Sequence, residues 1–248
     1  MNISEYMKNP LGKGASVLML STTRKALDDE YATIAAQITH KWYNLNNKYY
    51  IIHIKIPSKS ISQLYYDVLL EFDADSIPKQ VTVINNGKCR VFSNCPSFTF
   101  TFAYVFNKNK DIIPWTKKKY NSLVFKSNPA KRNPAEIRNY EKSLYFAIKY
   151  ITTNGRNYIA GINMNVNRIH SYYQILNNLQ SSDDITNAYH SKKNAEKTSS
   201  KNILKNEKNK SASLLTNAQS KSKKGAASKT KTVTISKKVS STRKIKKI

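Results

Sequence analysis

The chain has 248 residues, and its 42 Lys and Arg against 15 Asp and Glu give a formal net charge of +27 at pH 7. Charge of that size repels itself unless a polyanion or an acidic surface neutralises it, so we expect nucleic acid, an anionic membrane or an acidic assembly as the partner. Few cytosolic enzymes have this composition. The hydrophobic fraction of 40 % is enough to build a core and excludes disorder of the whole chain.

Two kinds of segment are excluded by inspection. No stretch contains the roughly 20 consecutive apolar residues that cross a bilayer, and residues 1–6 lack the basic and apolar regions of a signal peptide. The two cysteines, Cys89 and Cys95, are too few for a disulfide framework. We therefore expect synthesis in a reducing cytoplasm, two free thiols and no membrane partner.

The charge is unevenly distributed on the two sides of His190. Residues 1–190 carry 24 basic and 13 acidic side chains, a net charge of +11, and contain every aromatic residue and every proline. Residues 191–248 carry 18 basic and 2 acidic side chains, a net charge of +16. This contrast predicts a globular body over residues 1–190 and a Lys/Ser-rich basic tail over residues 191–248.

The tail lacks the apolar surface needed to offset the ordering of its backbone, which costs about 1 to 2 kcal/mol per residue. We expect it to be disordered alone and to become ordered only on a partner. Residues 229–239 alternate β-branched with polar residues, as a strand added to a partner's sheet would, and residues 199–218 have anchors for a short helix. Two interpretations stay open: a solubilising or nucleic-acid-neutralising tail, and an arm that folds onto neighbouring subunits.

The first predicted element of the body is a helix that begins near Thr22 or Thr23. Apolar residues at spacings of three and four place one apolar face along it. That face comprises Leu27, Tyr31, Ile34, Ala35, Ile38, Trp42 and Leu45.

A small antiparallel sheet of three or four strands is predicted next. Its strands cover residues 49–56, 64–72, 81–84 and 88–92, which are rich in β-branched and aromatic residues. The Asn-Gly step at residues 86–87 favours a tight hairpin turn between the last two strands.

Helices are predicted in the second half of the body. Residues 97–108 fit both strand and helix spacing, and the start at Pro96 and Ser97 favours a helix. A helix capped by Asn133 runs to residue 153, and a last helix lies between residues 158 and 179. The predicted fold class is α+β: a small antiparallel sheet with several helices, plus a long basic C-terminal extension.

A search for catalytic or cofactor-binding patterns finds none. The four histidines have no metal-ligand spacing, and the two cysteines have no nearby partners for a four-ligand zinc site. His53 lies inside a predicted strand, where a buried and hydrogen-bonded imidazole is expected. The acidic residues Asp67, Glu71, Asp73 and Asp75 are interpreted as a solvated edge. The sequence therefore predicts no enzyme, no cofactor and no metal site.

The candidate binding residues are basic, with one aromatic side chain among them. Cations near an aromatic ring can contact phosphates and stack bases, or contact an acidic protein surface, although a merely solvated loop explains the central group equally well. The candidates are Trp115, Lys117, Lys118, Lys119, Lys131 and Arg132 in the body, with Lys223, Lys224, Lys237, Lys238, Arg243 and Lys244 in the tail.

Several phrases of the body carry a resemblance to a known group of proteins. They are residues 1–14, 53–58, 65–68, 93–98, 103–108, 132–134 and 140–143. Across about residues 1–155, the chain resembles a virion structural protein encoded by crAss-like tailed bacteriophages. The resemblance implies a particle component near the portal, neck rings, capsid and packaged DNA, and it brings no catalytic residues.

Two functions are expected from these observations together. The first is a non-enzymatic ring or connector subunit at the portal vertex or neck of the virion, assembled in the host cytoplasm. It would form a homo-oligomeric ring and bind portal, capsid or other neck proteins through its basic arm, with DNA as a possible further contact. The alternative is a packaged or cytoplasmic protein that binds nucleic acid nonspecifically.

Overall fold

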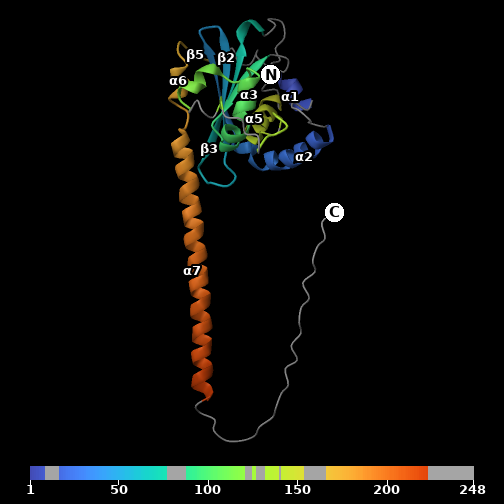
Figure 1. The fold of residues 1–248 in the computed structure, drawn as a ribbon. Helices are drawn as coiled ribbons and strands as arrows, with labels where there is room; N and C mark the ends of the chain where they lie inside the picture. Colours follow the sequence, from blue (N-terminus) through green and yellow to red (C-terminus); the bar gives the residue numbers. More distant parts are fainter. Residues whose placement is uncertain are drawn as a thin grey trace. The chain divides into compact units, whose positions relative to one another are not determined.

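The computed structural model describes residues 1–8, 17–76, 88–120, 125–126, 132–139, 141–153 and 166–222. The chain forms two compact units, Met1–Lys193 and Asn194–Ile248. The division falls three residues after the one that the charge distribution predicts. Figure 1 shows the first unit as a sheet with helices packed around it.

The core of the first unit is a five-stranded sheet in the order β4-β3-β2-β1-β5. Neighbouring strands are antiparallel except β5, which runs parallel to β1. The predicted strands at 49–56, 64–72 and 88–92 are confirmed, whereas 81–84 and the hairpin turn lie outside the described residues. The strands are β1 (Thr39–Leu45), β2 (Tyr49–Pro57), β3 (Tyr65–Asp73), β4 (Cys89–Ser93) and β5 (Asn167–Ile169).

The helices surround this sheet, so the fold is a mixed α/β fold, which confirms the coarser part of the predicted class. A π-helical turn over Phe98–Phe102 continues into α3, which confirms the helix predicted over 97–108. The helices are α1 (Ile3–Lys8), α2 (Val17–Ile34), α3 (Ala103–Lys108), α5 (Lys142–Thr152), α6 (Tyr173–Leu176) and α7 (Ser182–Ser222).

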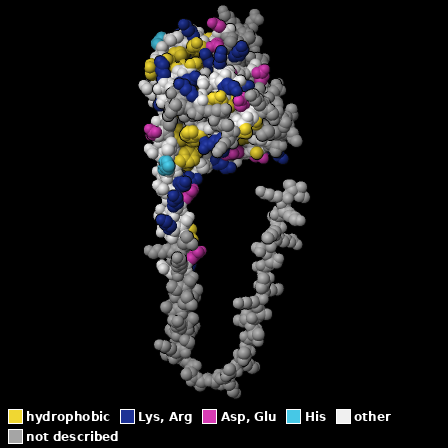
Figure 2. Space-filling model, viewed as in Figure 1, with side chains coloured by type: hydrophobic (Ala, Val, Ile, Leu, Met, Phe, Trp, Pro, Cys, Tyr) yellow, Lys and Arg dark blue, Asp and Glu magenta, His cyan; other side chains and the backbone are white. Residues whose placement is uncertain are grey.

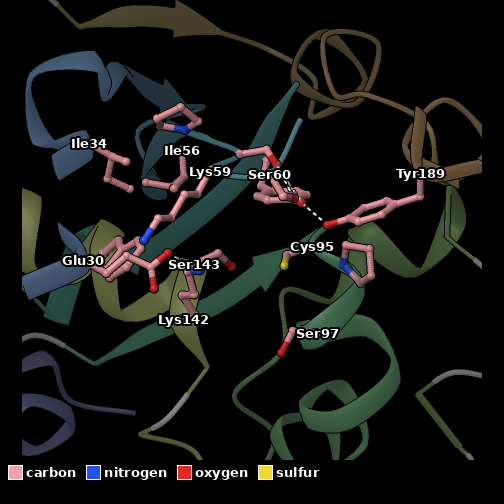
Figure 3. A pocket seen from close by; sticks show the side chains of 15 residues that line it. Glu30, Ile34, Ile56, Lys59, Ser60, Cys95, Ser97, Lys142, Ser143 and Tyr189 are labelled. Carbon is pink, nitrogen blue, oxygen red and sulfur yellow. Dashed lines mark hydrogen bonds and ion pairs between the residues drawn. The ribbon is translucent and has the colours of Figure 1, made fainter. Parts of the chain in front are cut away.

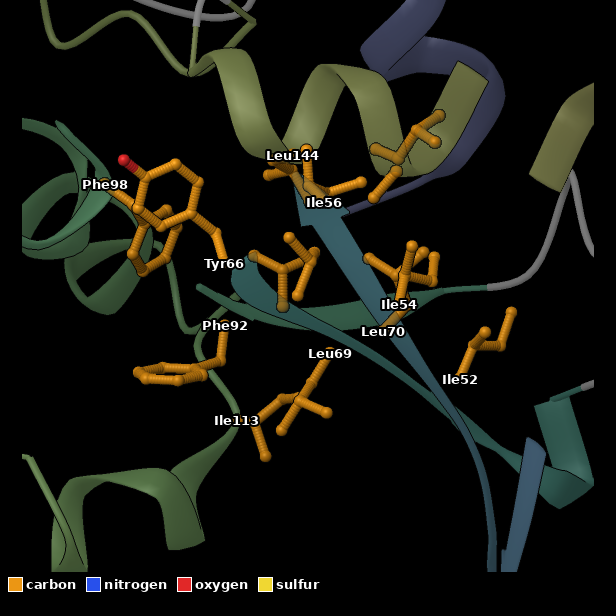
Figure 4. Close-up of a cluster of buried hydrophobic side chains, with 14 of the residues drawn as sticks. Ile52, Ile54, Ile56, Tyr66, Leu69, Leu70, Phe92, Phe98, Ile113 and Leu144 are labelled. Atoms are coloured by element: carbon orange, nitrogen blue, oxygen red, sulfur yellow. The ribbon is translucent and has the colours of Figure 1, made fainter. Parts of the chain in front are cut away.

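Both faces of the central strands are buried, which is why β2 and β3 read as almost continuous apolar runs. Ile52 pairs with Leu70 and Ile54 with Val68, so these four fully buried side chains share one face. Helix α5 packs on this face of β2 and β3, and Figure 4 shows Leu144 of α5 beside Ile56. Alternate residues of the same strands face the other side of the sheet, where the polar groups described below are buried.

The predicted helix from Thr22 to Leu45 is wrong in its second half. Helix α2 ends at Ile34, a 3-10 turn covers Ala35–Gln37, and β1 begins at Thr39. Trp42 and Leu45 are buried in β1, at positions whose side chains point to opposite faces of the sheet. Two apolar residues three apart fit a helix equally well, so their spacing alone could not identify the strand.

The predicted helix over 133–153 is wrong in its first half. The Asn133 side chain accepts from the backbone N–H of Ile137 and donates to the carbonyl oxygen of the same residue, each at 2.8 Å. Glu136 has a φ of 52°, in the left-handed region that an α-helix excludes. Helix α5 therefore begins only at Lys142, although it ends at Thr152, close to the predicted end.

The predicted helix over 158–179 is wrong over Asn167–Ile169 and is confirmed only for the short helix α6. Residues 154–165 lie outside the described ranges. Asn167–Ile169 form the edge strand β5, which pairs with Tyr43–Leu45, and helix α6 is a single short turn. Backbone pairing with β1 outweighs the weak helical spacing of this asparagine-rich segment.

Helix α7 begins with a reciprocal cap. The Ser181 hydroxyl oxygen accepts from the backbone N–H of Asp184 at 3.1 Å, and an Asp184 carboxylate oxygen accepts from that of Ser181 at 3.2 Å. The helix runs through residues 191–222, which are expected from the sequence to be disordered alone. Lys193, Lys197 and Lys201 are exposed on it at four-residue spacing. The strand predicted over 229–239 lies outside the described residues.

The N-cap of α5 gives a test of the core. The Glu141 carboxylate is fully buried and accepts from the Leu144 N–H at 2.6 Å and from the Ser143 hydroxyl at 2.7 Å. Burial raises the pKa of Glu141, against a lowering by these hydrogen bonds. The folded state therefore binds this proton more tightly than the unfolded state, so the free energy of unfolding that Glu141 contributes falls as pH rises from about 4.5.

We expect the stability of Glu141→Gln relative to the unsubstituted chain to increase from pH 4 to pH 8, because glutamine keeps the two acceptor contacts without a charge. Urea unfolding at several pH values measures this difference. Glu5→Gln, at an exposed position, is the matched control. A difference for Glu141→Gln that stays constant with pH would contradict the buried-charge explanation.

Candidate functional site

A buried polar network connects the sheet to the segment that precedes α7. The Asp67 side chain on β3 is 1 % exposed, and one of its oxygens lies 2.7 Å from His53 Nε2 on β2. Its other oxygen accepts from Asn94 Nδ2 at 2.9 Å and from the backbone N–H of Gln180 at 2.8 Å. Three chain segments are thus attached to one carboxylate in the interior of the first unit.

The loop around residue 119 holds the same segment from its other side. Lys119 Nζ donates to the carbonyl oxygens of Leu176 and Leu179 at 2.6 and 2.8 Å. The Tyr120 hydroxyl donates to the carbonyl oxygen of Gln180 at 2.8 Å. A cation at carbonyls that end a helical turn is favourable. We call the contacts made by Asp67, Asn94, Lys119 and Tyr120 with residues 176–180 the root clamp.

The other predicted site residues near Lys119 also have partners within the chain. Trp115 Nε1 donates to Glu71 Oε2 at 2.6 Å. Lys117 Nζ contacts Asn107 Oδ1 and lies 6.0 Å from the centre of the Phe125 ring. The exposed Lys118 donates to the Tyr172 hydroxyl, and this hydrogen bond raises the pKa of Lys118 and lowers that of Tyr172.

The remaining predicted residues are not brought into this group. Arg132 is exposed in a turn before α5. Lys131 lies outside the described residues. So do all six tail candidates, which are Lys223, Lys224, Lys237, Lys238, Arg243 and Lys244.

The expected solvated acidic edge is wrong for two of its members. Asp67 and Glu71 are 1 % and 2 % exposed, and they contact the Gln180 backbone and Trp115 of η5 (Pro114–Lys118), respectively. Arg90 lies 2.9 Å from both Glu71 Oε1 and Asp73 Oδ1. Burial raises the pKa of Glu71, while hydrogen bonds and charge from Trp115 and Arg90 act to lower it.

The first unit also contains a cavity of about 470 Å³ between β2, α5 and the start of α7 (Figure 3). Hydroxyl groups of Ser58, Ser60 and Ser143 line it, and Lys142 forms an ion pair with Glu30 beside it. Burial raises the pKa of the lining Cys95 to about 12, so this thiol is neutral at physiological pH and a poor nucleophile. The expectation that His53 is buried with a partner and that both cysteines are free thiols is confirmed.

Two adjoining hollows on the first unit form a polar groove that is not predicted from the sequence. They share Lys41, Tyr43 and Asn178 and have volumes of about 450 and 170 Å³. Arg168 of β5 and Lys55 of β2 contribute further cations. These residues come from segments far apart in the chain, so no local run of charge marks them.

Within the described ranges, no group of three or more His, Cys, Asp or Glu side chains is placed to hold a metal ion. None of the helices that the structure describes is both long and apolar enough to cross a membrane. No protein-family model, curated protein or solved structure matches the chain.

The root clamp generates a stability prediction. Asp67→Ala removes the acceptor of His53, Asn94 and the Gln180 N–H, and we expect a loss of about 3 kcal/mol in the free energy of unfolding, because buried donors left unpaired are costly. Urea unfolding monitored by tryptophan fluorescence measures it. Asp73→Ala is the control: this carboxylate is half exposed on β3, and its loss costs about 1 kcal/mol or less. Equal losses in the two variants would show that the clamp has no special weight.

Proposed function

We propose that this chain is a non-enzymatic structural component of a tailed-phage virion, a ring or connector subunit at the portal vertex or neck. Its basic C-terminal segment binds neighbouring virion proteins, such as portal, capsid or other neck proteins. The observation that carries the proposal is the root clamp, which fixes residues 176–180 just before α7, the helix that leads into the basic tail.

Such a clamp is expected where the segment that follows it binds a partner and must be held firmly to the body. Lys119, Tyr120 and Asn94 donate to carbonyl oxygens of Leu176, Leu179 or Gln180. The Asp67 carboxylate accepts from the Gln180 N–H. A tail that served only solubility would need no buried carboxylate and no lysine at its attachment point. The clamp therefore favours an arm over a merely solubilising tail.

The charge of the C-terminal segment indicates what such an arm binds. Residues 191–248 have a net charge of +16 and no aromatic residue, so acidic surfaces attract the segment over a wide area while it offers few apolar anchors. A segment that becomes ordered on its partner covers a large surface at modest affinity per unit area. Adjacent subunits of an assembly present such surfaces at high local concentration.

The resemblance over residues 1–155 supports the tailed-phage particle as the assembly to which the chain belongs. Ring formation belongs to the proposal, because subunits at a portal vertex are arranged around a symmetry axis. The proposal places the protein in the virion after assembly in the host cytoplasm.

Mass spectrometry of purified particles of the phage that encodes the chain tests the proposal. We expect this experiment to detect the chain in multiple copies per particle. We also expect light scattering of the purified protein to give the mass of a closed oligomer. Absence of the chain from intact particles would overturn the proposal.

The arm is tested separately by charge removal. We expect Lys223→Gln, Lys224→Gln, Lys237→Gln and Lys238→Gln together to lower the copy number in particles at least tenfold, because four contacts to acidic surfaces are lost. The control replaces four exposed lysines of the body, Lys25, Lys48, Lys59 and Lys110, by Gln. An equal effect of the two sets would show that total charge, not the arm, recruits the protein.

A further inference from the structure

The polar groove between β1, β5 and α6 has no assigned role. One of its hollows is lined by Lys41, Tyr43, Asn167, Arg168, Ile169, Gln174, Asn177 and Asn178, and the other by Thr39, His40, Lys41, Tyr43, His53, Lys55 and Asn178. None of these lining residues is acidic. We propose that this groove binds the sugar-phosphate backbone of single-stranded nucleic acid.

The charges of the groove are available to a ligand. Lys41, Lys55 and Arg168 are exposed, and none of the three forms an ion pair with another described residue. In the register of β1 with β2, Lys41 lies opposite His53 and Lys55 lies opposite Thr39. Lys41 and Lys55 therefore point to the same face of the sheet. Like charges held this close raise the local affinity for an anion.

The carboxylate opposite Lys55 in the sheet forms no ion pair with this lysine. Asp67 lies opposite Lys55 in the pairing of β2 with β3. It is buried, however, and its oxygens accept from His53, Asn94 and the Gln180 N–H. The Asp67 oxygens are thus engaged within the interior, and the exposed Lys55 ammonium group can contact an external anion.

The amide side chains of the groove suit a phosphate backbone with its sugars. Gln174, Asn177 and Asn178 add hydrogen-bonding groups without negative charge. The Asn178 amide donates to the Gln174 carbonyl oxygen at 2.7 Å, which holds the wall of the groove in shape. Neutral donors beside separated cations are typical of backbone recognition, where charge gives affinity and amides give position.

An exposed aromatic ring favours single-stranded nucleic acid over an acidic polypeptide. Tyr173, next to Gln174 in α6, is 52 % exposed. It continues a ladder in which Trp115 stacks on Tyr172 with ring centres 5.5 Å apart, and Tyr172 lies 4.6 Å from Tyr173. Lys118 Nζ is 5.9 Å from the Tyr173 ring centre. In Figure 2, hydrophobic and basic side chains lie together over the part of the body where Figure 1 shows α6. Rings of this kind stack on unpaired bases.

The test measures binding of the full chain to a fluorescent oligothymidylate by anisotropy at several salt concentrations. The groove variant carries Lys41→Gln, Lys55→Gln and Arg168→Gln. The slope of log K against log salt is negative, and each lost phosphate contact reduces its magnitude by about 0.7. For the groove variant we therefore expect a slope about 2 smaller in magnitude and an affinity about 100-fold lower at 0.1 M salt. An unchanged slope would overturn the proposal.

A matched control separates the groove from total charge, because the basic tail also attracts polyanions. Lys25→Gln, Lys59→Gln and Lys110→Gln remove the same charge from exposed positions outside the groove. The proposal expects this variant to keep nearly the full slope and affinity. If both variants lose binding equally, the attraction is diffuse and the groove is not a site. Circular dichroism melting of both variants verifies that they are folded.

The aromatic contribution has its own pair of variants. We expect Tyr173→Leu to lower oligothymidylate affinity about tenfold, because stacking on one base is lost, while Phe100→Leu, at another exposed ring, leaves it unchanged. Polyglutamate is the competing ligand. Binding of polyglutamate that is as tight as that of the oligonucleotide, with no effect of Tyr173→Leu, would assign the groove to an acidic protein and overturn the proposal. The outcome does not depend on whether the chain occurs in a virion.

Discussion

The buried carboxylate of Asp67 is the constraint on which the arrangement of the first unit depends. It lies near the start of β3 and accepts hydrogen bonds from His53 of β2, from Asn94 after β4 and from the backbone of Gln180. An apolar residue would pack there without fixing any of these segments. The carboxylate favours a single arrangement of these segments, because each donor that loses it is left without a hydrogen-bond partner in the interior. The sheet, the loop after β4 and the approach to α7 are therefore positioned together.

The elements that the sequence could predict are those whose side chains report burial directly. Strands β2 and β3 are buried on both faces, so their runs of Ile, Val and Leu indicate strands without ambiguity. The predictions that failed depend on groups far away in the chain. Trp42 and Leu45 have helical spacing but lie in a strand that pairs with β2. Asn133 and Glu136 belong to a turn, and the residue propensity of Glu136 does not predict its left-handed backbone conformation. Periodicity identifies a buried face, but it does not identify the partner that buries it.

The candidate site shows the same limit in its charges. Lys117, Lys118 and Lys119 form the most conspicuous basic run of the body, yet the structure pairs them with Asn107, Tyr172 and two backbone carbonyls. Lys41 and Lys55 are isolated in the sequence and share a face of the sheet because β1 pairs with β2. Arg168 of the edge strand β5 lines the same hollow as Lys41. A local run of charge in the sequence indicates the solubility of that segment. Which cations share a surface depends on how the strands pair in the sheet.

The row of lysines on α7 gives this helix a built-in sensitivity to its surroundings. Lys193, Lys197 and Lys201 lie one above another on successive turns, and each like-charged pair at this spacing opposes the helix by about 0.2 to 0.5 kcal/mol. Salt or a polyanion that lies along the row relieves this repulsion. A ligand that binds the helix better than the coil also favours the helix, so a polyanion bound along this row would stabilise α7.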